Sequence, residues 1–260
     1  MAASDNNIIY FDLTVNKLIN FLKKIKDLTT INEKIVMRID SDKILIFSFV
    51  GENFKNIHAF KNYIFSLDEV MEIKKGVISS PLLFIIRDGK KFHRILNNFT
   101  DYENNLKCKL VYDEDNYVNF ISFDNTKLNT KIIGGNGSSV KIDISIDDVN
   151  YLMNGEKCIF NFRLNKLDFL KIKKMSLIEN EPKSVLYIII NNKKLSIGEG
   201  ETKWHLNITD IDYEDIIMSF PKSYFNTISP EDFIEILVFD NFIICKYDSY
   251  NLMIILETSI

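Results

Sequence analysis

The sequence predicts an α+β protein: two similar domains of antiparallel β-sheet with two short helices each. Three observations predict this class. Apolar runs rich in Ile, Val, Phe and Tyr recur along the 260 residues, as in strands. Short turn sequences separate consecutive runs. Two lysine-rich segments have similar sequences, VNKLINFLKKIKDL at 15–28 and LNKLDFLKIKKMSL at 164–177. Each segment follows an alternating apolar run.

Composition narrows the kind of protein further. The chain is 46% hydrophobic and has a net charge of −4, so it can bury a core, and a contact with nucleic acid requires a local basic patch. Cys108, Cys158 and Cys245 lie far apart without the spacing of a metal site or a disulfide framework. We therefore expect no metal and no cofactor.

Neither a signal-peptide pattern nor an apolar run of the ~18 residues needed for a membrane span occurs in the sequence. We expect a soluble protein of a reducing compartment, the cytoplasm, or the host cytoplasm if the protein is viral.

The strands follow from the apolar runs in chain order. After the run before the first lysine-rich segment, strands are expected at 34–40, 43–50, 106–112, 117–123, 184–190, 233–239 and 251–257. Turn residues join several neighbours directly, which favours antiparallel pairing. These turns are Ser41-Asp42, Asp113 to Asn116, Asn191-Asn192 and Asp240-Asn241.

Helical periodicity occurs in four places. Segments 15–28 and 89–99 each have a clean apolar stripe, segment 164–177 has a weaker one, and segment 221–229 starts with Pro, which favours a first helical turn. Each half of the chain then has the order strand, basic helix, meander, strand, short basic helix, hairpin or meander. This order indicates a duplicated domain.

The domain boundary is expected near the flexible stretch GGNGSS at 134–139. We expect an N-terminal domain at 1–139, a connector at 140–155 and a C-terminal domain at 156–260. The pattern from Gly51 to Ser80 does not predict a particular element.

The helices carry outward cations in an acidic chain. A single helix with one apolar and one cationic side is ordinarily explained by packing on a sheet, with the charged side in solvent. Here, however, positive charge is concentrated on the helices. Lysines without interleaved aromatic residues contact phosphates, so binding would be sequence-neutral and salt-sensitive. The candidate DNA-facing residues are Lys17, Lys23, Lys24, Lys90, Lys91, Arg94, Lys166, Lys173, Lys174 and Lys222.

The chain resembles the DNA polymerase sliding clamps, of the two-domain kind exemplified by proliferating cell nuclear antigen and the phage processivity clamps. The resemblance covers nearly the whole chain and lies in NIIYFDLTVNKLINFLKKIKDL, KCIFNFRLNKLDFLKIKKMSLI, LLFIIRDGKKFHRILNNF and the ending from FPKSYF to LMIILE. It implies the DNA clamp fold and a closed homotrimeric ring whose helices surround double-stranded DNA. The implied partners are that DNA, a DNA polymerase and a clamp loader ATPase.

The resemblance also implies further site residues. A pocket for a partner's peptide would be bordered by Val140, Ile142, Ile144, Tyr151, Leu152, Thr258 and Ile260. Subunits would join at strand edges near 128–133 and 203–208. The interface residues would then be Leu128, Ile132, Ile133, Trp204, Leu206 and Ile208.

Two other kinds of protein are alternatives to a closed clamp. An enzyme needs convergent catalytic groups, but His58, His93 and His205 have no triad or ligand spacing and no glycine-rich phosphate loop occurs. We therefore expect no enzyme. A monomeric or open viral processivity factor, or a structural β protein, would keep the duplicated fold without the closed ring, and the mass in solution distinguishes these forms.

Overall fold

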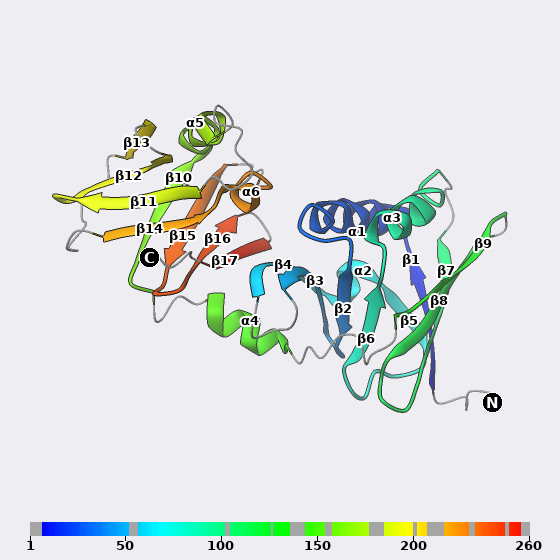
Figure 1. The fold of residues 1–260 in the computed structure, drawn as a ribbon. Coiled ribbons are helices and arrows are strands. Elements are labelled where there is room, and N and C mark those ends of the chain that lie inside the picture. The colour runs from blue at the N-terminus through cyan, green and yellow to red at the C-terminus, as the bar shows by residue number, and fades with distance from the viewer. Residues whose placement is uncertain are drawn as a thin grey trace. The chain divides into compact units, whose positions relative to one another are not determined.

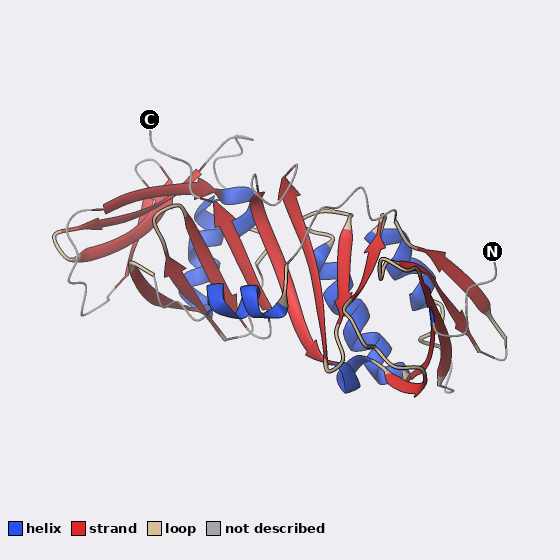
Figure 2. Cartoon of the chain, turned by 90° about the horizontal axis from the view of Figure 1, so that it is seen from below, coloured by secondary structure: helices blue, strands red, loops and turns tan. Residues whose placement is uncertain are grey.

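The computed structural model places the chain in two compact units, Met1–Ile146 (unit 1) and Asp147–Ile260 (unit 2), each with its own sheets and helices (Figure 1). The described residues are 7–51, 57–101, 105–125, 127–135, 144–153, 158–176, 185–199, 202–206, 216–228, 232–247 and 250–255. Figure 2 shows helices behind the strands in both units and one further helix in front of the strands.

Unit 1 builds two antiparallel sheets, ordered β5-β1-β7-β8-β9 and β6-β2-β3-β4. Helices α1 and α3 pack beside each other. Phe21 of α1 contacts Phe65 of β4, and Phe99, two residues after the end of α3, contacts Phe123 of β8. The elements are β1 (Ile8–Leu13), α1 (Val15–Leu28), β2 (Ile35–Ile39), β3 (Lys43–Gly51), β4 (Ile57–Ser66), α2 (Leu67–Val70), β5 (Glu72–Lys75), β6 (Leu82–Ile86), α3 (Gly89–Asn97), β7 (Leu106–Tyr112), β8 (Val118–Asp124) and β9 (Asn129–Ile133).

Unit 2 repeats this plan, with described strands ordered β10-β15-β16-β17 and β14-β11-β12-β13 within the unit. The first sheet corresponds to β1-β7-β8-β9 and the second to β6-β2-β3-β4. Its elements, which follow helix α4 (Ile146–Met153), are β10 (Phe160–Asn165), α5 (Lys166–Ser176), β11 (Val185–Asn191), β12 (Lys194–Glu199), β13 (Thr202–Leu206), β14 (Ile216–Pro221), α6 (Lys222–Phe225), β15 (Phe233–Val238), β16 (Phe242–Tyr247) and β17 (Tyr250–Ile255).

The expected α+β class and the largely antiparallel sheets are confirmed. The turn between β11 and β12 has Asn192 at φ 50° and Lys193 at φ 61°. Two consecutive positive φ values are characteristic of a type I′ hairpin, whose twist matches that of the strands. In the turn after β7, the Asp113 carboxylate accepts hydrogen bonds from the backbone N–H groups of Asp115 and Tyr117.

The sequence similarity of the two lysine-rich segments does not match their structural alignment. The similar sequences align Leu18 with Leu167, but Leu18 is 1% exposed and Leu167 is 70% exposed. The caps set the true alignment: Thr14 accepts a hydrogen bond at the start of α1 and Asn165 accepts one at the start of α5. Leu18 therefore corresponds to Phe169, which is fully buried, so the two similar segments are out of register by two residues.

The stretch from Gly51 to Ser80 contains β4, α2 and β5. Helix α2 begins at a capping arrangement in which the Glu69 carboxylate accepts from the Ser66 N–H at 2.9 Å. Strand β5 adds to the first sheet beside β1. The four-stranded sheet of unit 2 that corresponds to it has no such added strand among the described residues.

Candidate nucleic-acid interface

The solvent side of α1 and α3 in unit 1 carries a group of cations. Helix α1 is capped by Thr14 and α3 by Asp88, whose carboxylate accepts from the Lys91 N–H at 2.7 Å, and each helix buries an apolar stripe. The exposed cations on the opposite side are Lys23, Lys26, Lys90, Lys91 and Arg94. Lys26 was missed by the sequence analysis, although it lies three residues after Lys23 and therefore on the same helical face.

Several candidate lysines of unit 1 have partners within the protein. The Lys17 ammonium donates to the Asp68 carbonyl, and the Lys24 ammonium lies 4.8 Å from the centre of the Tyr63 ring. Lys90 forms an exposed ion pair with Glu33 at 2.7 Å. No ion pair to Lys23, Lys26, Lys91 or Arg94 is recorded within the described part of the chain. We call these four residues the helix cations.

A shallow hollow of about 600 Å³ lies on the outer side of α3. Its lining residues are Lys91, His93, Arg94, Ile95, Asn97 and Asn98. Burial, and then the positive charge of Lys26, lower the pKa of His93 below its ordinary value of 6.5. His93 is therefore mainly neutral at pH 7, and the cations around it, together with two amide side chains, suit an anionic group such as a phosphate.

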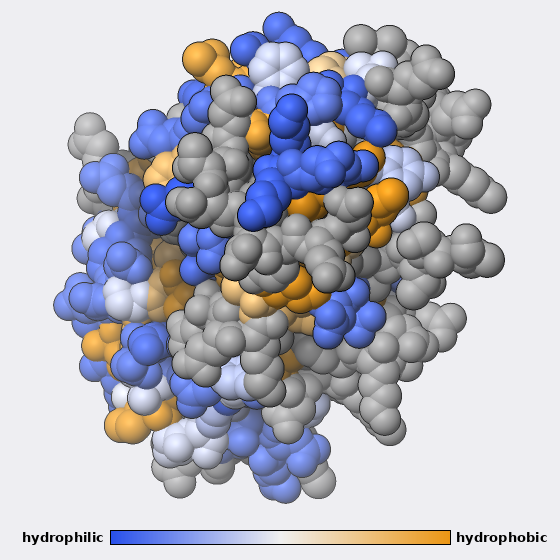
Figure 3. Space-filling view, turned by 90° about the vertical axis from the view of Figure 1, so that its left-hand side faces the viewer, coloured by the Kyte–Doolittle hydropathy of each residue, from blue (hydrophilic) through white to orange (hydrophobic). Residues whose placement is uncertain are grey.

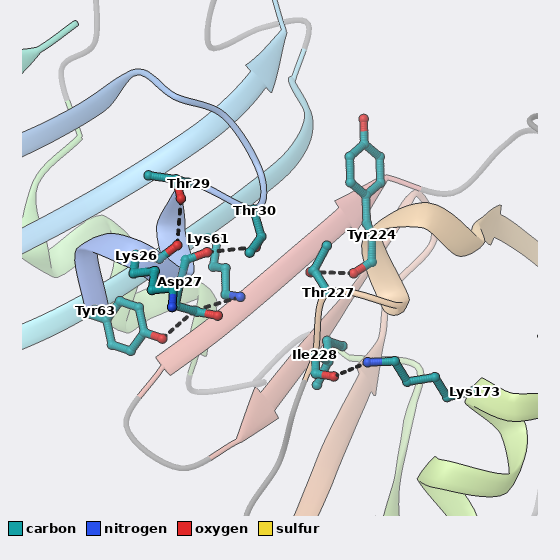
Figure 4. A network of polar contacts seen from close by, with 10 residues as sticks. All are labelled: Lys26, Asp27, Thr29, Thr30, Lys61, Tyr63, Lys173, Tyr224, Thr227 and Ile228. Atoms are coloured by element: carbon teal, nitrogen blue, oxygen red, sulfur yellow. Dashed lines mark hydrogen bonds and ion pairs between the residues drawn. The ribbon is translucent and has the colours of Figure 1, made fainter. Parts of the chain in front are cut away.

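In unit 2 the helix α5 places Lys166, Lys171 and Lys174 at the surface. Lys171, which the sequence analysis omitted, lies over the Trp204 ring with its ammonium 4.4 Å from the ring centre. Two candidate side chains, those of Lys173 and Lys222, do not point outward. Lys173 donates to the Ile228 carbonyl at 2.9 Å (Figure 4), and burial lowers the pKa of its ammonium.

The expectation that Lys222 points outward is wrong, since only 8% of this residue is exposed. The expected helix at 221–229 is a single turn, α6, and this turn buries Lys222 together with Phe225. A short helix has no room for separate apolar and cationic faces, so the position of Lys222 could not be read from the periodicity.

Among the described residues, β9 and β13 form edges of their sheets. They fall in the segments 128–133 and 203–208 where edges were expected, although 207–208 lie outside the described part. Ile133 of β9 is 72% exposed, Leu128 and Ile132 are half-buried, and a hollow of about 360 Å³ lies between β9 and α3. Its apolar lining residues are Ile86, Phe92, Ile95, Ile132 and Ile133, and its charged ones are Arg87, Asp88, Lys91 and Lys131.

The β13 edge lies beside α5. The Trp204 indole N–H donates to the Asp168 carboxylate at 3.2 Å, and Leu206 is buried, whereas Ile208 lies outside the described residues. Leu167 and Leu170 of α5 are exposed. Viewed from the side of unit 2, Figure 3 shows hydrophobic surface in separate patches among hydrophilic residues.

The expected peptide pocket is only partly described. Ile144 is buried, and its carbonyl accepts from the Arg38 guanidinium at 3.2 Å, while Tyr151 is exposed. Leu152 lies in α4, but its side chain is outside the described part, as are Val140, Ile142, Thr258 and Ile260.

The described residues contain no group of three or more His, Cys, Asp or Glu that could hold a metal ion. Cys108 and Cys245 are buried, and burial raises the pKa of both thiols, to about 12 for Cys245. Such thiols are inert rather than nucleophilic. Among the described residues no helix is long and apolar enough to cross a membrane.

No family model and no curated protein sequence matches the chain, but solved structures do. The DNA polymerase III subunit beta from Borrelia burgdorferi matches with a TM-score of 0.64 at 16% identity, over 96% of this chain and 65% of that one. The beta chain from Streptococcus pneumoniae matches with a TM-score of 0.67 at 12% identity, over 97% and 66%.

The proliferating cellular nuclear antigen from Entamoeba histolytica matches with a TM-score of 0.61 at 12% identity, over 96% of this chain and 98% of that one. The present chain thus spans about two thirds of the length of the bacterial beta subunits and nearly all of the E. histolytica protein. The duplicated units, their sheet order and these neighbours agree: the chain has the fold of the DNA sliding clamps.

Proposed function

We propose that this protein is a sliding clamp, a non-catalytic processivity factor that encircles duplex DNA and tethers a replicative polymerase. The observation that carries the proposal is the placement of the helix cations Lys23, Lys26, Lys91 and Arg94. They lie on adjoining helices of one unit in a chain whose net charge is −4. Lysine and arginine side chains of this kind neutralise phosphates without reading bases.

The exposed cations of α5 extend the proposed DNA-facing set into unit 2. We include Lys166, Lys171 and Lys174 and omit the buried Lys222. Lysines on flexible side chains hold a polyanion without fixing its position, which suits a protein that must slide along DNA.

We further propose that three copies form the ring and that β9 of one protomer pairs with β13 of the next. Unpaired strand edges favour such pairing, and a head-to-tail contact of this type closes into a ring when the rotation per subunit divides a full turn. The hollow beside β9 and the exposed Leu167 and Leu170 beside β13 supply apolar surface to both sides of the contact.

The proposed partners beyond DNA are a DNA polymerase and a clamp loader ATPase. Their peptides would bind near the connector at 140–155, where the Arg38–Ile144 hydrogen bond joins the connector to β2. An open or monomeric processivity factor is the rival form of this function.

Electron microscopy of the purified protein tests the ring directly. We expect particles with a central hole and a mass about three times the 30.4 kDa of the chain. Retention on nicked circular DNA, with loss after the circle is cut, would follow from encirclement. A strict monomer that still stimulates a polymerase on linear DNA would contradict the ring and favour the open form.

A further inference from the structure

The face of the first sheet of unit 1 that points away from α1 and α3 carries a second row of cations. Ile9, Phe11 and Leu13 of β1 are buried toward the helices, so Tyr10 points to the opposite face. On that face, cross-strand partners continue from Tyr10 in both directions. The row across β5, β1, β7, β8 and β9 is Lys75, Tyr10, Lys109, Ser122 and Lys131.

The three lysines of this row, Lys75, Lys109 and Lys131, occupy alternate strands. Neighbouring strands are ~4.8 Å apart, so the lysines are spaced at ~10 Å along a line of ~20 Å. The row itself contains no acidic residue, and none of the three lysines has an ion pair recorded among the described residues. We call these three residues the sheet lysines.

Aromatic rings lie among the sheet lysines. Tyr10 is 38% exposed, with the Lys75 and Lys109 ammonium groups 6.0 and 5.9 Å from its ring centre. The Lys131 ammonium lies 3.6 Å from the centre of the half-buried Phe120 ring. The aromatic residues of α1 and α3, Phe21 and Phe92, are buried, so the two cationic surfaces of unit 1 differ in chemistry.

The rows on the two sides of the sheet lysines differ in chemistry: one is apolar and the other is acidic. One neighbouring row, Ile8, Val111, Phe120 and Ile133, is apolar. The other contains Asp12, Glu72 and Asp124 together with Lys107, and Lys74 pairs with both Asp12 and Glu72. A polyanion on the sheet lysines would therefore be repelled from the acidic row, and its apolar groups would lie toward Tyr10 and Phe120.

We propose that this sheet face binds single-stranded nucleic acid, with phosphates on the sheet lysines and bases against Tyr10 and the apolar row. Proteins that bind single strands combine a cationic track with aromatic stacking surfaces, and antiparallel sheets with exposed aromatic residues serve this purpose. The inference does not rest on the proposed sliding-clamp function. Edge pairing at β9 would use backbone groups and leave the Lys131 side chain on the sheet face.

The test measures binding of a fluorescein-labelled 20-nucleotide oligo(dT) to the 260-residue protein by anisotropy, in low salt. We expect the Lys75→Ala, Lys109→Ala, Lys131→Ala triple variant to lose at least ten-fold in affinity, because three phosphate contacts are removed. Tyr10→Leu should lose roughly ten-fold with little change in salt dependence, since stacking is not ionic. Lys74→Ala is the matched control, since this neighbouring lysine is already paired with carboxylates, and it should bind oligo(dT) as the wild type does.

Three results would overturn the proposal. Unchanged oligo(dT) affinity in the triple variant would show that the sheet lysines do not bind the strand. An equal loss in a Lys23→Ala, Arg94→Ala variant would place the strand on the helices instead. Tighter binding of polyglutamate than of oligo(dT), abolished by the same triple change, would identify an acidic-peptide site. Duplex binding that survives in the triple variant keeps this outcome separate from the sliding-clamp proposal.

Discussion

At the residue scale, unit 1 contains a buried charge whose partner comes from a distant part of the chain. Lys61 of β4 is fully buried, and its ammonium lies 2.7 Å from the Asp27 carboxylate (Figure 4). The Tyr63 hydroxyl donates to the same carboxylate. Asp27 is in the last turn of α1, where the helix dipole disfavours a negative charge, so Lys61 and Tyr63 offset an unfavourable position.

Removing the carboxylate should therefore destabilise unit 1. Asp27→Ala leaves the Lys61 ammonium buried without this anion, and breaking a buried pair from one side costs about 3 kcal/mol. The Asp27→Ala, Lys61→Met double variant should recover part of that loss because no charge stays buried. Urea denaturation of the wild type, both single variants and the double variant measures the coupling; additive losses would mean that the two residues act independently.

At the scale of elements, the two helices of unit 1 should govern the salt dependence of duplex binding. Replacing Lys23, Lys26, Lys91 and Arg94 with Ala should weaken duplex binding. It should also reduce the slope of log affinity against log salt by roughly 1 for each cation that contacts a phosphate. Titrations of a labelled duplex at several salt concentrations measure both quantities.

Lys90→Ala is the control for this experiment, because Lys90 lies on the same helix but already pairs with Glu33. Its slope should change less than that of a Lys91→Ala variant. A quadruple variant with the wild-type slope and an unchanged oligomeric mass would remove the helices from the duplex-binding site.

The local pattern of apolar residues was enough to predict most of the helices and strands of the fold. Segments 15–28 and 106–112 agree with α1 and β7 at both ends, since a wide apolar stripe or a clear run ends at a cap or a turn. Strand β4 escaped prediction for a physical reason. Its neighbouring Lys61 and Asn62 are both fully buried, which breaks the alternation of a half-buried strand, and the partner that permits Lys61 lies 34 positions earlier in the printed sequence.

The candidate site was predicted less well than the fold. Periodicity separates a polar side of a helix from an apolar one, but it cannot show that Lys173 reaches the Ile228 carbonyl or that Lys222 is buried by a one-turn helix. Contacts made by a long side chain depend on the neighbouring element, and this information is absent from the local sequence. Lys26 and Lys171, in contrast, were open to prediction from helical spacing.

At the scale of the whole molecule, the proposed ring depends on what covers the β9 edge. Ile133 exposes 72% of its surface, and Val77, in the connection between β5 and β6, exposes 77%. Isolated exposed apolar residues are common and need no partner. Ile133 differs from Val77 because it ends an unpaired edge strand and lines the hollow beside α3.

A matched pair of substitutions separates an interface from ordinary exposure. Ile133→Glu places a charge in the proposed contact, where burial without a partner is unfavourable, so the trimer should dissociate toward the 30.4 kDa monomer. Val77→Glu makes the same chemical change at an equally exposed apolar position outside the proposed contact and should leave the trimer intact. Sedimentation velocity over a range of concentrations measures the mass of both variants beside the wild type. Dissociation by both changes, or by neither, would mean that β9 does not close the ring.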